Sequence, residues 1–386
     1  MPVERVDQFV HYRPEQCEHC QAKLRAKDSP DDPSPRWHQV CELPPISAIV
    51  TEHQAHGRTC SCCGQITFAE IPAAVRSHAI GPNLAGAMIY LAGRCHDSRR
   101  TVVEIVNDLF GVPVSLGTVS NYEAEMGDAL EDSHRQALSV VQKARVKNVD
   151  ETGWKQAGKP RWLWTAATRT VAAFGILAGR TIGSFHEMLG EKVKGIIQSD
   201  RLPTYNQVPP ERRGICWSHI SRDFQKWLDL GGATKLLGED GRKICRGVFK
   251  LWRDFREGKF NRKSLRRRIK RLRQRMVQVL RWGLRCGDRK AVRFCRNILA
   301  VEEALWTFAR VPGVEPTNNH AERMLRRAVL WRKNCFGSHS QRGCRFAERI
   351  LTIVQTLRLQ NRNVLRFIQD TLAAARGHNP LPKLVL

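Results

Sequence analysis

The stretch Ala144–Trp154, ARVKNVDETGW, constrains the fold most, because it joins a strand pattern to a pair of acids. Apolar and polar residues alternate as far as Val149, which predicts a half-buried β-strand. Asp150 and Glu151 follow, and Gly153 is expected to turn the chain. Open α/β sheets place their chemistry outside the ends of strands. The stretch therefore predicts an α/β fold with an acidic site where this strand ends.

Two more acids are candidates to share this site. Asp200 follows a short apolar strand predicted over residues 194–198, and Glu322 lies in a segment whose apolar residues recur at helical spacing. Mg²⁺ and Mn²⁺ take oxygen ligands from few carboxylates. Asp150, Asp200 and Glu322, arriving from two strands and a helix, are therefore predicted to form one metal-binding catalytic set.

Each acid also has a structural interpretation when it is considered alone. Glu151 is a rival ligand directly beside Asp150, which itself ends a strand. Asp200 begins a turn-like sequence, and Glu322, three residues after Asn319, has the spacing of the return half of a helix cap. These alternatives stay open at the level of the sequence.

The segment after the first strand predicts the rest of a sheet. Residues 161–167 and 170–177 are rich in β-forming residues, a helix is expected near 182–189, and another strand precedes Asp200. Three antiparallel strands, a helix and then a strand beside the first form the opening of a ribonuclease H-like sheet. The predicted fold class is therefore α/β, with a mixed sheet flanked by helices.

The charge of the chain favours a polyanionic partner. Sixty-four Lys and Arg face 37 Asp and Glu, which gives a formal net charge of +27 over 386 residues. No apolar run reaches the roughly 18 residues that a membrane-spanning helix requires, and the first ten residues lack the apolar core of a signal peptide. We expect a soluble cytoplasmic protein, associated with the nucleoid when it is bound to DNA, with no membrane partner.

Much of this charge lies in one segment, residues 242–296, which holds 22 Lys or Arg and 3 Asp or Glu. Apolar residues interleave at helical spacing, so the segment is expected to fold and to present its charge on one face. An ordinary solvated face is the alternative. We favour sequence-independent contact with DNA phosphates, through Arg266, Arg267 and Lys270 among others.

Thirteen cysteines in a long chain without an export signal argue against a disulfide framework. Cys17 and Cys20 form one C-x-x-C pair, and Cys60 and Cys63 form a second pair after 39 intervening residues. Four thiolates would hold one structural Zn²⁺, with the strand-like run 46–56 returning the second pair to the first. Unpaired cysteines are the alternative, and nearby competitors for a ligand position are Cys41, Cys62, His19, His38 and His56.

Residues 81–143 predict helices. A helix-turn-helix unit is predicted here: a first helix follows Arg99 and Arg100, GVPVS forms the turn, and a second helix starts at Leu116. A linking helix is expected over 131–143. An ordinary packed helix pair is the alternative. The side chains predicted to face a DNA groove are Ser115, Thr118, Ser120, Asn121 and Tyr122.

Four motifs in fixed order carry a family resemblance: VDETGW, SDRLPTYN, CWSHISRDF and NNHAERMLRRAVLWRKNCFGS. Through them the chain resembles the transposases of the insertion-sequence 66 family, a branch of the DDE transposases. The resemblance implies a ribonuclease H-like catalytic domain with a helical insertion between the second and third acids. The family's acids fall on Asp150, Asp200 and Glu322, with 49 and 121 residues intervening.

The resemblance implies a transposase that binds double-stranded DNA, both the terminal inverted repeats of its mobile element and target DNA. Two Mg²⁺ or Mn²⁺ ions would serve cleavage and strand transfer. A homodimer or larger assembly is expected at the paired ends, with accessory proteins of the same mobile element as possible partners. The alternatives are a non-catalytic DNA-binding repressor and a ribonuclease H-like nuclease without joining activity.

Further DNA contacts are expected around Glu322. Arg326 lies one helical turn on and is expected to grip the scissile phosphate. Further predicted DNA contacts are Arg323, His320 and Lys333. His219 is interpreted as a structural histidine, with phosphate contact or leaving-group protonation as the alternative.

The predicted domain organisation has four parts. A zinc-binding module covers residues 1–75, and the helical region covers 81–143. The catalytic domain covers 144–342 with its insertion at about 220–310, and C-terminal helices that serve packing cover 343–386.

Overall fold

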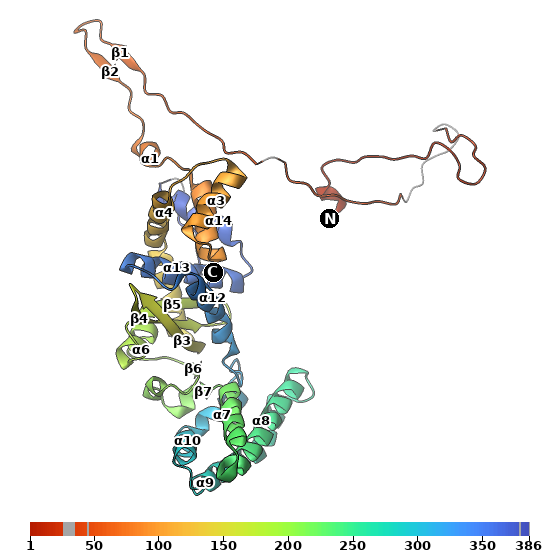
Figure 1. Ribbon diagram of the computed structural model, residues 1–386, viewed down its shortest axis with the longest axis vertical. Helices are drawn as coiled ribbons and strands as arrows, with labels where there is room; N and C mark the ends of the chain where they lie inside the picture. Colours follow the sequence, from red (N-terminus) through yellow and green to blue (C-terminus); the bar gives the residue numbers. More distant parts are fainter. Residues whose placement is uncertain (26–34, 45, 378–379, 386) are drawn as a thin grey trace. The chain divides into compact units, whose positions relative to one another are not determined.

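The computed structural model describes residues 1–25, 35–44, 46–377 and 380–385. The predicted zinc-binding module and the C-terminal region each include a few residues outside these ranges. The chain divides into two compact units, Met1–Ile49 and Val50–Leu386. The second unit contains a five-stranded sheet. Some helices pack on the faces of this sheet, and others lie beyond each of its ends (Figure 1). None of the helices in the described part of the chain combines the length and apolar character that a membrane crossing requires.

The five-stranded sheet is mixed, with the strand order β5-β4-β3-β6-β7. Its antiparallel half is the predicted meander of β3 (Val146–Gln156), β4 (Lys159–Ala167) and β5 (Ala172–Leu177). Its parallel half adds β6 (Ile196–Ser199) beside β3, and β7 (Arg213–Ile215) beside β6. The predicted mixed sheet, with a strand returning beside the first, is therefore confirmed.

Helices predicted from periodicity also form. Those over residues 131–143 and 182–189 have the expected bounds, and the predicted insertion corresponds to helices α7 to α11. A separate small sheet pairs β1 (Gly57–Thr59) with β2 (Ile66–Phe68). The α-helices are α1 (Ala73–Arg76), α2 (Pro82–Tyr90), α3 (Arg99–Phe110), α4 (Leu116–Ala129), α5 (Glu131–Lys143), α6 (Ile182–Leu189), α7 (Trp217–Leu230), α8 (Lys235–Arg256), α9 (Arg262–Gly283), α10 (Arg289–Ala300), α11 (Thr307–Arg310), α12 (Asn319–Cys335), α13 (Gln341–Leu359) and α14 (Val364–Ala375).

The first strand of the sheet is longer than predicted. Gly153 does not turn the chain, because it pairs with Trp162 inside the β3–β4 ladder, and pairing continues to Gln156. The turn is made by Ala157 and Gly158, both at positive φ (48° and 78°), as a tight two-residue hairpin requires. Asp150 therefore lies in the middle of β3, and the prediction that it ends a strand is wrong.

Helix α13 covers the free edge of β5. Strand N–H groups two residues apart meet helix side chains four residues apart, so each outward-facing N–H finds an acceptor. This arrangement agrees with the packing role predicted for the C-terminal helices. The three bonds run from the backbone N–H of Ala172 to Thr356 Oγ1 (3.1 Å), of Phe174 to Thr352 Oγ1 (3.0 Å) and of Ile176 to Glu348 Oε2 (2.9 Å).

The end of α12 is tied back to β3 through Gly337 and Ser338. The N–H of Ser338 donates to Lys155 O (2.9 Å), and the N–H of Ala157 donates to Ser338 O (2.8 Å). Gly337 has φ +111°, and a Cβ there would lie 2.3 Å from Lys155 O. The glycine is therefore required by both its conformation and the close backbone approach.

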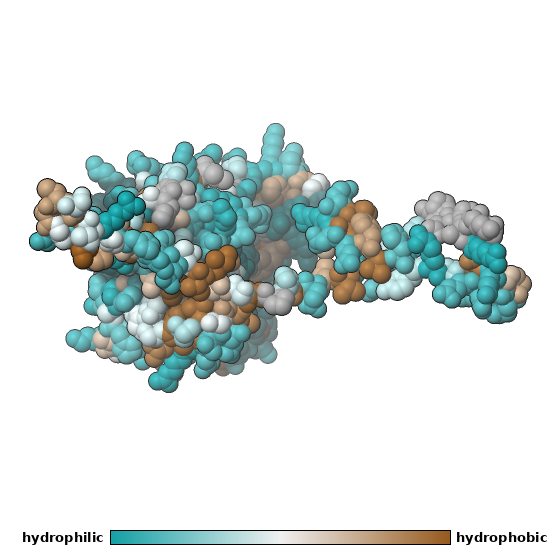
Figure 2. Space-filling view, turned by 90° about the horizontal axis from the view of Figure 1, so that it is seen from above, coloured by the Kyte–Doolittle hydropathy of each residue, from teal (hydrophilic) through white to brown (hydrophobic). Residues whose placement is uncertain are grey.

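The helical insertion has its own apolar core and presents its charge outward, as predicted. On α9, Leu265 and Ile269 are buried while Arg266, Arg267 and Lys270 are exposed. Trp282 is an exception among the predicted core residues, at 43% exposure. Hydrophilic residues cover most of the face of the molecule shown in Figure 2.

Candidate active site

Asp150 lies on β3, and Asp200 directly follows the neighbouring parallel strand. The β3–β6 register pairs Asn148 with Gln198, and β6 ends at Ser199. The charge of Asp200 contributes to the raised pKa of Asp150, so the two carboxylates lie near each other. Asp200 also begins the predicted turn, since its Oδ1 accepts the N–H of Leu202 (2.8 Å). That bond occupies one carboxylate oxygen and leaves Asp200 at the end of β6.

Asn318 fixes the start of α12 against β3. Its buried side chain donates from Nδ2 to Val149 O (2.8 Å) and accepts from Asn148 Nδ2 (3.0 Å). These bonds hold the helix on the backbone segment that carries Asp150. Glu322 follows one turn later, and its N–H donates to Asn318 O (3.2 Å). This role of Asn318 could not be predicted from the sequence, because it depends on contacts with a strand 169 residues away.

The capping alternative for Glu322 is not realised. Helix α12 begins at Asn319, and its N-cap residue Asn318 makes no capping hydrogen bond with its side chain. Glu322 Oε1 is instead buried without a hydrogen-bond partner in the described part of the chain. An unpaired carboxylate oxygen at this depth is costly unless a cation or donor meets it.

The acids influence one another electrostatically. Burial, the neighbouring Glu151 and then Asp200 and Glu322 raise the pKa of Asp150 from its ordinary 3.8 to about 7. A hydrogen bond from the Glu151 N–H to Asp150 Oδ1 (3.0 Å) opposes this rise. The site is thus built so that bringing the three charges together is unfavourable without a compensating positive charge.

Substitution of Asp150 by Asn is expected to stabilise the metal-free protein more at pH 8 than at pH 5. The folded pKa exceeds the unfolded one, so the cost of the carboxylate grows as pH rises from about 4 to about 7 and stays complete above that, at about 4 kcal/mol at most. Thermal unfolding in a chelator at both pH values measures the difference. Asp229→Asn, at an exposed acid of α7, is the matched control with little expected change. A lower melting temperature for Asp150→Asn at pH 8 would contradict the prediction.

Glu151, the rival ligand, is directed to the other face of β3 and is buried. Tyr205 donates its hydroxyl to Glu151 Oε2 (2.6 Å), and Arg180 makes an ion pair with Oε1 at 3.0 Å. Adjacent strand residues point to opposite faces, so Asp150 faces α12 while Glu151 faces this polar cluster. The geometry favours Asp150 over Glu151 as the ligand.

Arginines stand beside the acids. Asp150, Glu322, Arg323 and Arg326, together with Glu151, line one open hollow of about 530 Å³, whose lining does not include Asp200. The predicted proximity of Arg326 to Glu322 is therefore observed, and Arg323 joins it. A phosphate in this hollow would meet two guanidinium groups next to the carboxylates.

His320 and Lys333 occupy different surroundings on the same helix. His320 Nε2 is hydrogen-bonded to Thr168 O (2.6 Å), which ties α12 to the β4–β5 turn. Burial lowers its pKa. Lys333 is exposed near the end of α12. Arg332, which the sequence did not single out, reaches Thr152 Oγ1 (3.3 Å) and also donates to Gly153 O.

The donor set at this site fits hard divalent cations. Asp150, Asp200 and Glu322 offer only oxygen, which Mg²⁺ and Mn²⁺ prefer. Among the described residues, one group of three His, Cys, Asp or Glu has all its donor atoms within 4.8 Å of one another, and it consists of Cys216, His219 and Glu322. The three acids are spaced more widely. Wider spacing suits a pair of ions about 4 Å apart, because acids on different ions need not touch.

The helix pair α3 and α4 forms as predicted, but α4 is partly packed. Tyr122, one of the predicted groove-facing side chains, is buried, because α4 packs against α13 and α14. Ser115 accepts the N–H of Thr118 (3.0 Å) as the helix N-cap. Arg99 pairs with Glu123 at 2.5 Å, which joins the two helices. Asn121 remains exposed on the outer face.

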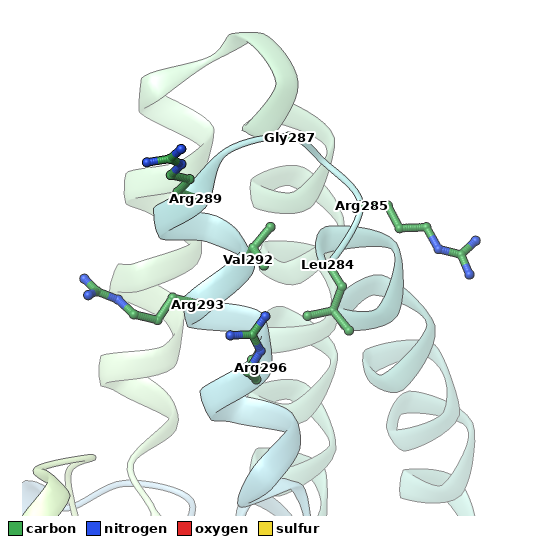
Figure 3. A pocket seen from close by; sticks show the side chains of 7 residues that line it. All are labelled: Leu284, Arg285, Gly287, Arg289, Val292, Arg293 and Arg296. Atoms are coloured by element: carbon green, nitrogen blue, oxygen red, sulfur yellow. The ribbon is translucent and has the colours of Figure 1, made fainter.

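A second basic hollow lies in the insertion between the end of α9 and α10. It measures about 530 Å³, and its lining includes Arg285, Arg289, Arg293 and Arg296. Three of these project from α10 at a spacing of four and three residues, which places them on one helix face, while Arg285 points away from them (Figure 3). The sequence marked this region as basic without singling out these arginines.

The two C-x-x-C pairs adopt the same local turn. The N–H of Cys17 donates to Ala22 O (2.9 Å), and the N–H of Cys60 donates to Gln65 O (2.8 Å). The residues after Cys20 and Cys63 both have positive φ. Backbone N–H groups of Cys20 and Cys63 lower the pKa of the Cys17 and Cys60 thiols, respectively. Each pair is therefore arranged locally as thiolate ligands of zinc would be.

Two features of the predicted zinc module differ from expectation. The run 46–56, all of it described, forms no strand, and the β1–β2 hairpin beside Cys60 follows it instead. Cys17 and Cys20 lie in the first compact unit, whereas Cys60 and Cys63 lie in the second. The β-branched residues of the run predicted strand pairing, but none of the described strands pairs with the run.

A known protein family matches the part of the chain that contains Asp150, Asp200 and Glu322. No curated protein matches the chain significantly. The family model described as "Transposase IS66 family" matches residues 98–346, a span that includes α3 to α12, the whole sheet and all three acids. The paired cysteines lie outside the match. The match covers well over half of the sequence, and the chain therefore belongs to the IS66 family of transposases.

Proposed function

We propose that the protein is a DNA transposase that binds the terminal repeats of its mobile element and catalyses metal-dependent cleavage and strand transfer. Asp150, Asp200 and Glu322 are the catalytic acids. The observation that supports the proposal is the proximity of these acids: Asp200 follows the strand beside β3, and Glu322 lies one turn into the helix that Asn318 holds against β3. The raised pKa of Asp150 supports the proposal, because ionising this carboxyl group beside the other acids is unfavourable until a cation neutralises them.

Asp150, Asp200 and Glu322 would hold two Mg²⁺ or Mn²⁺ ions. When bound, such a pair activates the attacking water or 3′-hydroxyl and stabilises the leaving oxygen. Arg323 and Arg326 hold the scissile phosphate in the shared hollow and orient it toward the acids. No covalent intermediate with the protein is needed, since both steps are phosphoryl transfers.

DNA beyond the scissile phosphate would be held by the basic surfaces. Arg266, Arg267 and Lys270 on α9 are exposed and suited to phosphate contact. Arg99 and Arg100 begin α3, and Lys333 extends the basic face of α12. His320 has a weaker claim, because its ring is engaged by Thr168.

Structural Zn²⁺ binding is also part of the proposal, with Cys17 and Cys20 as one pair of thiolate ligands and Cys60 and Cys63 as another. The matching turns of the two pairs support it. Synapsis of two ends requires at least a dimer, because each end needs an active site. Accessory proteins of the same mobile element are further candidate partners.

A nicking and joining assay tests the proposed function. We expect duplex DNA carrying the element end to be nicked in Mg²⁺ or Mn²⁺, and a pre-cleaved end to be joined to target DNA. Cleavage of the first substrate without joining of the second would indicate a nuclease. Specific binding with neither reaction would indicate a repressor, and either result would overturn the transposase assignment.

A further inference from the structure

Behind the candidate catalytic acids lies a second cluster of metal-ligating side chains. Cys216 follows β7 and is the N-cap residue of α7, and His219 sits in the first turn of that helix. Their donor atoms and a carboxylate oxygen of Glu322 all lie within 4.8 Å of one another. His219 Nδ1 is 3.8 Å from Glu322 Oε1. The cluster therefore shares one residue with the catalytic set and adds a thiol and an imidazole.

The polar atoms of this cluster are not satisfied by the protein. His219 Nδ1 and Glu322 Oε1 are both buried and both lack a hydrogen-bond partner in the described part of the chain. Their separation of 3.8 Å is too long for a hydrogen bond between them. Buried polar atoms without partners are uncommon in folded proteins, so this facing pair points to a cation or another ligand that binds between them.

Cys216 completes the third side of this space. It is fully buried, and its Sγ accepts the backbone N–H of Asn318 at 3.2 Å. That bond fixes the sulfur beside the start of α12. Burial raises the pKa of the Cys216 thiol, and the bond from the Asn318 N–H opposes this rise. The same asparagine clamps α12 to β3, so the position of Cys216 relative to Glu322 is set by the backbone rather than by flexible side chains.

A thiolate, an imidazole and a carboxylate form the ligand set of a borderline-soft cation. Zn²⁺ takes S, N and O ligands at about 2.0 to 2.3 Å, so tetrahedral donors stand about 3.5 Å apart. Since its donor atoms lie within 4.8 Å of one another, the cluster would have to contract by roughly 1.3 Å at most to reach this spacing. Three protein ligands leave a fourth position open to water. Mg²⁺ has little affinity for sulfur, so the site discriminates against the proposed catalytic ion.

We propose that Cys216, His219 and Glu322 bind Zn²⁺ or a similar cation, and that this binding withdraws Glu322 from the catalytic acids and inhibits DNA cleavage. Binding releases the thiol proton of Cys216 to solvent and forms one bond each to sulfur, nitrogen and oxygen. Glu322 cannot direct the same oxygen to both sites. The inhibition rests on the proposed function, whereas the binding does not.

Cobalt substitution tests the binding directly. In the full-length protein saturated with Co²⁺, we expect a near-ultraviolet thiolate-to-cobalt band that is partly lost in Cys216→Ser and weakened in His219→Ala. The residual band reports the N-terminal cysteines. Cys344→Ser, at a buried cysteine of α13, is the matched control and should keep the full band. Thermal unfolding identifies the folded variants, and His219, being half-exposed, gives a second variant if Cys216→Ser does not fold. Identical spectra in wild type and the folded site variant would overturn the proposal.

Zinc inhibition tests the coupling to Glu322. Zn²⁺ is titrated against cleavage in excess Mg²⁺, and each variant is compared with its own zinc-free rate. We expect the inhibitory concentration to rise by more than about tenfold in His219→Ala and Cys216→Ser and to stay unchanged in Cys344→Ser. Equal inhibition of all proteins, despite a cobalt band that depends on Cys216, would overturn the withdrawal of Glu322. Absence of cleavage in every protein would instead overturn the proposed function, and the cobalt spectra would still decide the binding.

Discussion

Asp150→Ala is expected to slow DNA cleavage at least about a thousandfold while DNA binding is retained. Asp150 is proposed as a ligand of the catalytic cations, so its loss removes one of the three carboxylates that would hold them. Its side chain makes no bond to the basic surfaces that are proposed to hold DNA. Cleavage of an element-end duplex and a gel-shift titration of the same duplex measure the two quantities separately.

The same loss is expected for Asp200→Ala and Glu322→Ala. Asp229→Ala is the matched control, since it removes an exposed acid of α7 whose carboxylate accepts a hydrogen bond from Gln225. Its cleavage rate should stay within about twofold of wild type. Retention of substantial cleavage by any one of the three acid variants would show that the acid is not a catalytic ligand.

Asn318→Ala is expected to lower both stability and cleavage. The change leaves Val149 O and Asn148 Nδ2 without their buried partner, which costs about 2 to 4 kcal/mol. It also loosens the start of α12, so Glu322 is no longer held to within the fraction of an ångström that catalysis requires. Urea unfolding and cleavage at a temperature where the variant is folded measure the two effects.

Asn319→Ala is the matched control for Asn318→Ala. Asn319 is the neighbouring residue, is exposed and has the same side chain. We expect its unfolding free energy to change by less than about 0.5 kcal/mol. Equal stability of the two variants would show that the side-chain bonds of Asn318 do not clamp the helix.

The elements of the catalytic fold could be predicted from local sequence patterns. The alternation around Val149 marks a strand because one of its faces is buried, and the basic segment forms helices because its apolar residues recur at helical spacing. The length of β3 could not be predicted, because Gly153 stays extended only through its pairing with Trp162. A glycine alone signals a turn as readily as a close-packed strand position.

The finer structure of the site depends on contacts between distant segments. Nothing near Glu151 in the sequence indicates that Tyr205 and Arg180 would bind it on the opposite face of β3. The burial of Tyr122 likewise follows from helices that lie over 200 residues further along the chain. Sequence patterns predict which face of an element is buried more reliably than which segment buries it.

Metal binding by Asp150, Asp200 and Glu322 is tested most directly by locating Mn²⁺ with anomalous diffraction from crystals of the protein bound to its end DNA. We expect strong anomalous peaks within about 2.5 Å of carboxylate oxygens from Asp150 and from Asp200 or Glu322, next to the scissile phosphate. Mn²⁺ bound elsewhere at high occupancy, with none at these three carboxylates, would contradict this expectation.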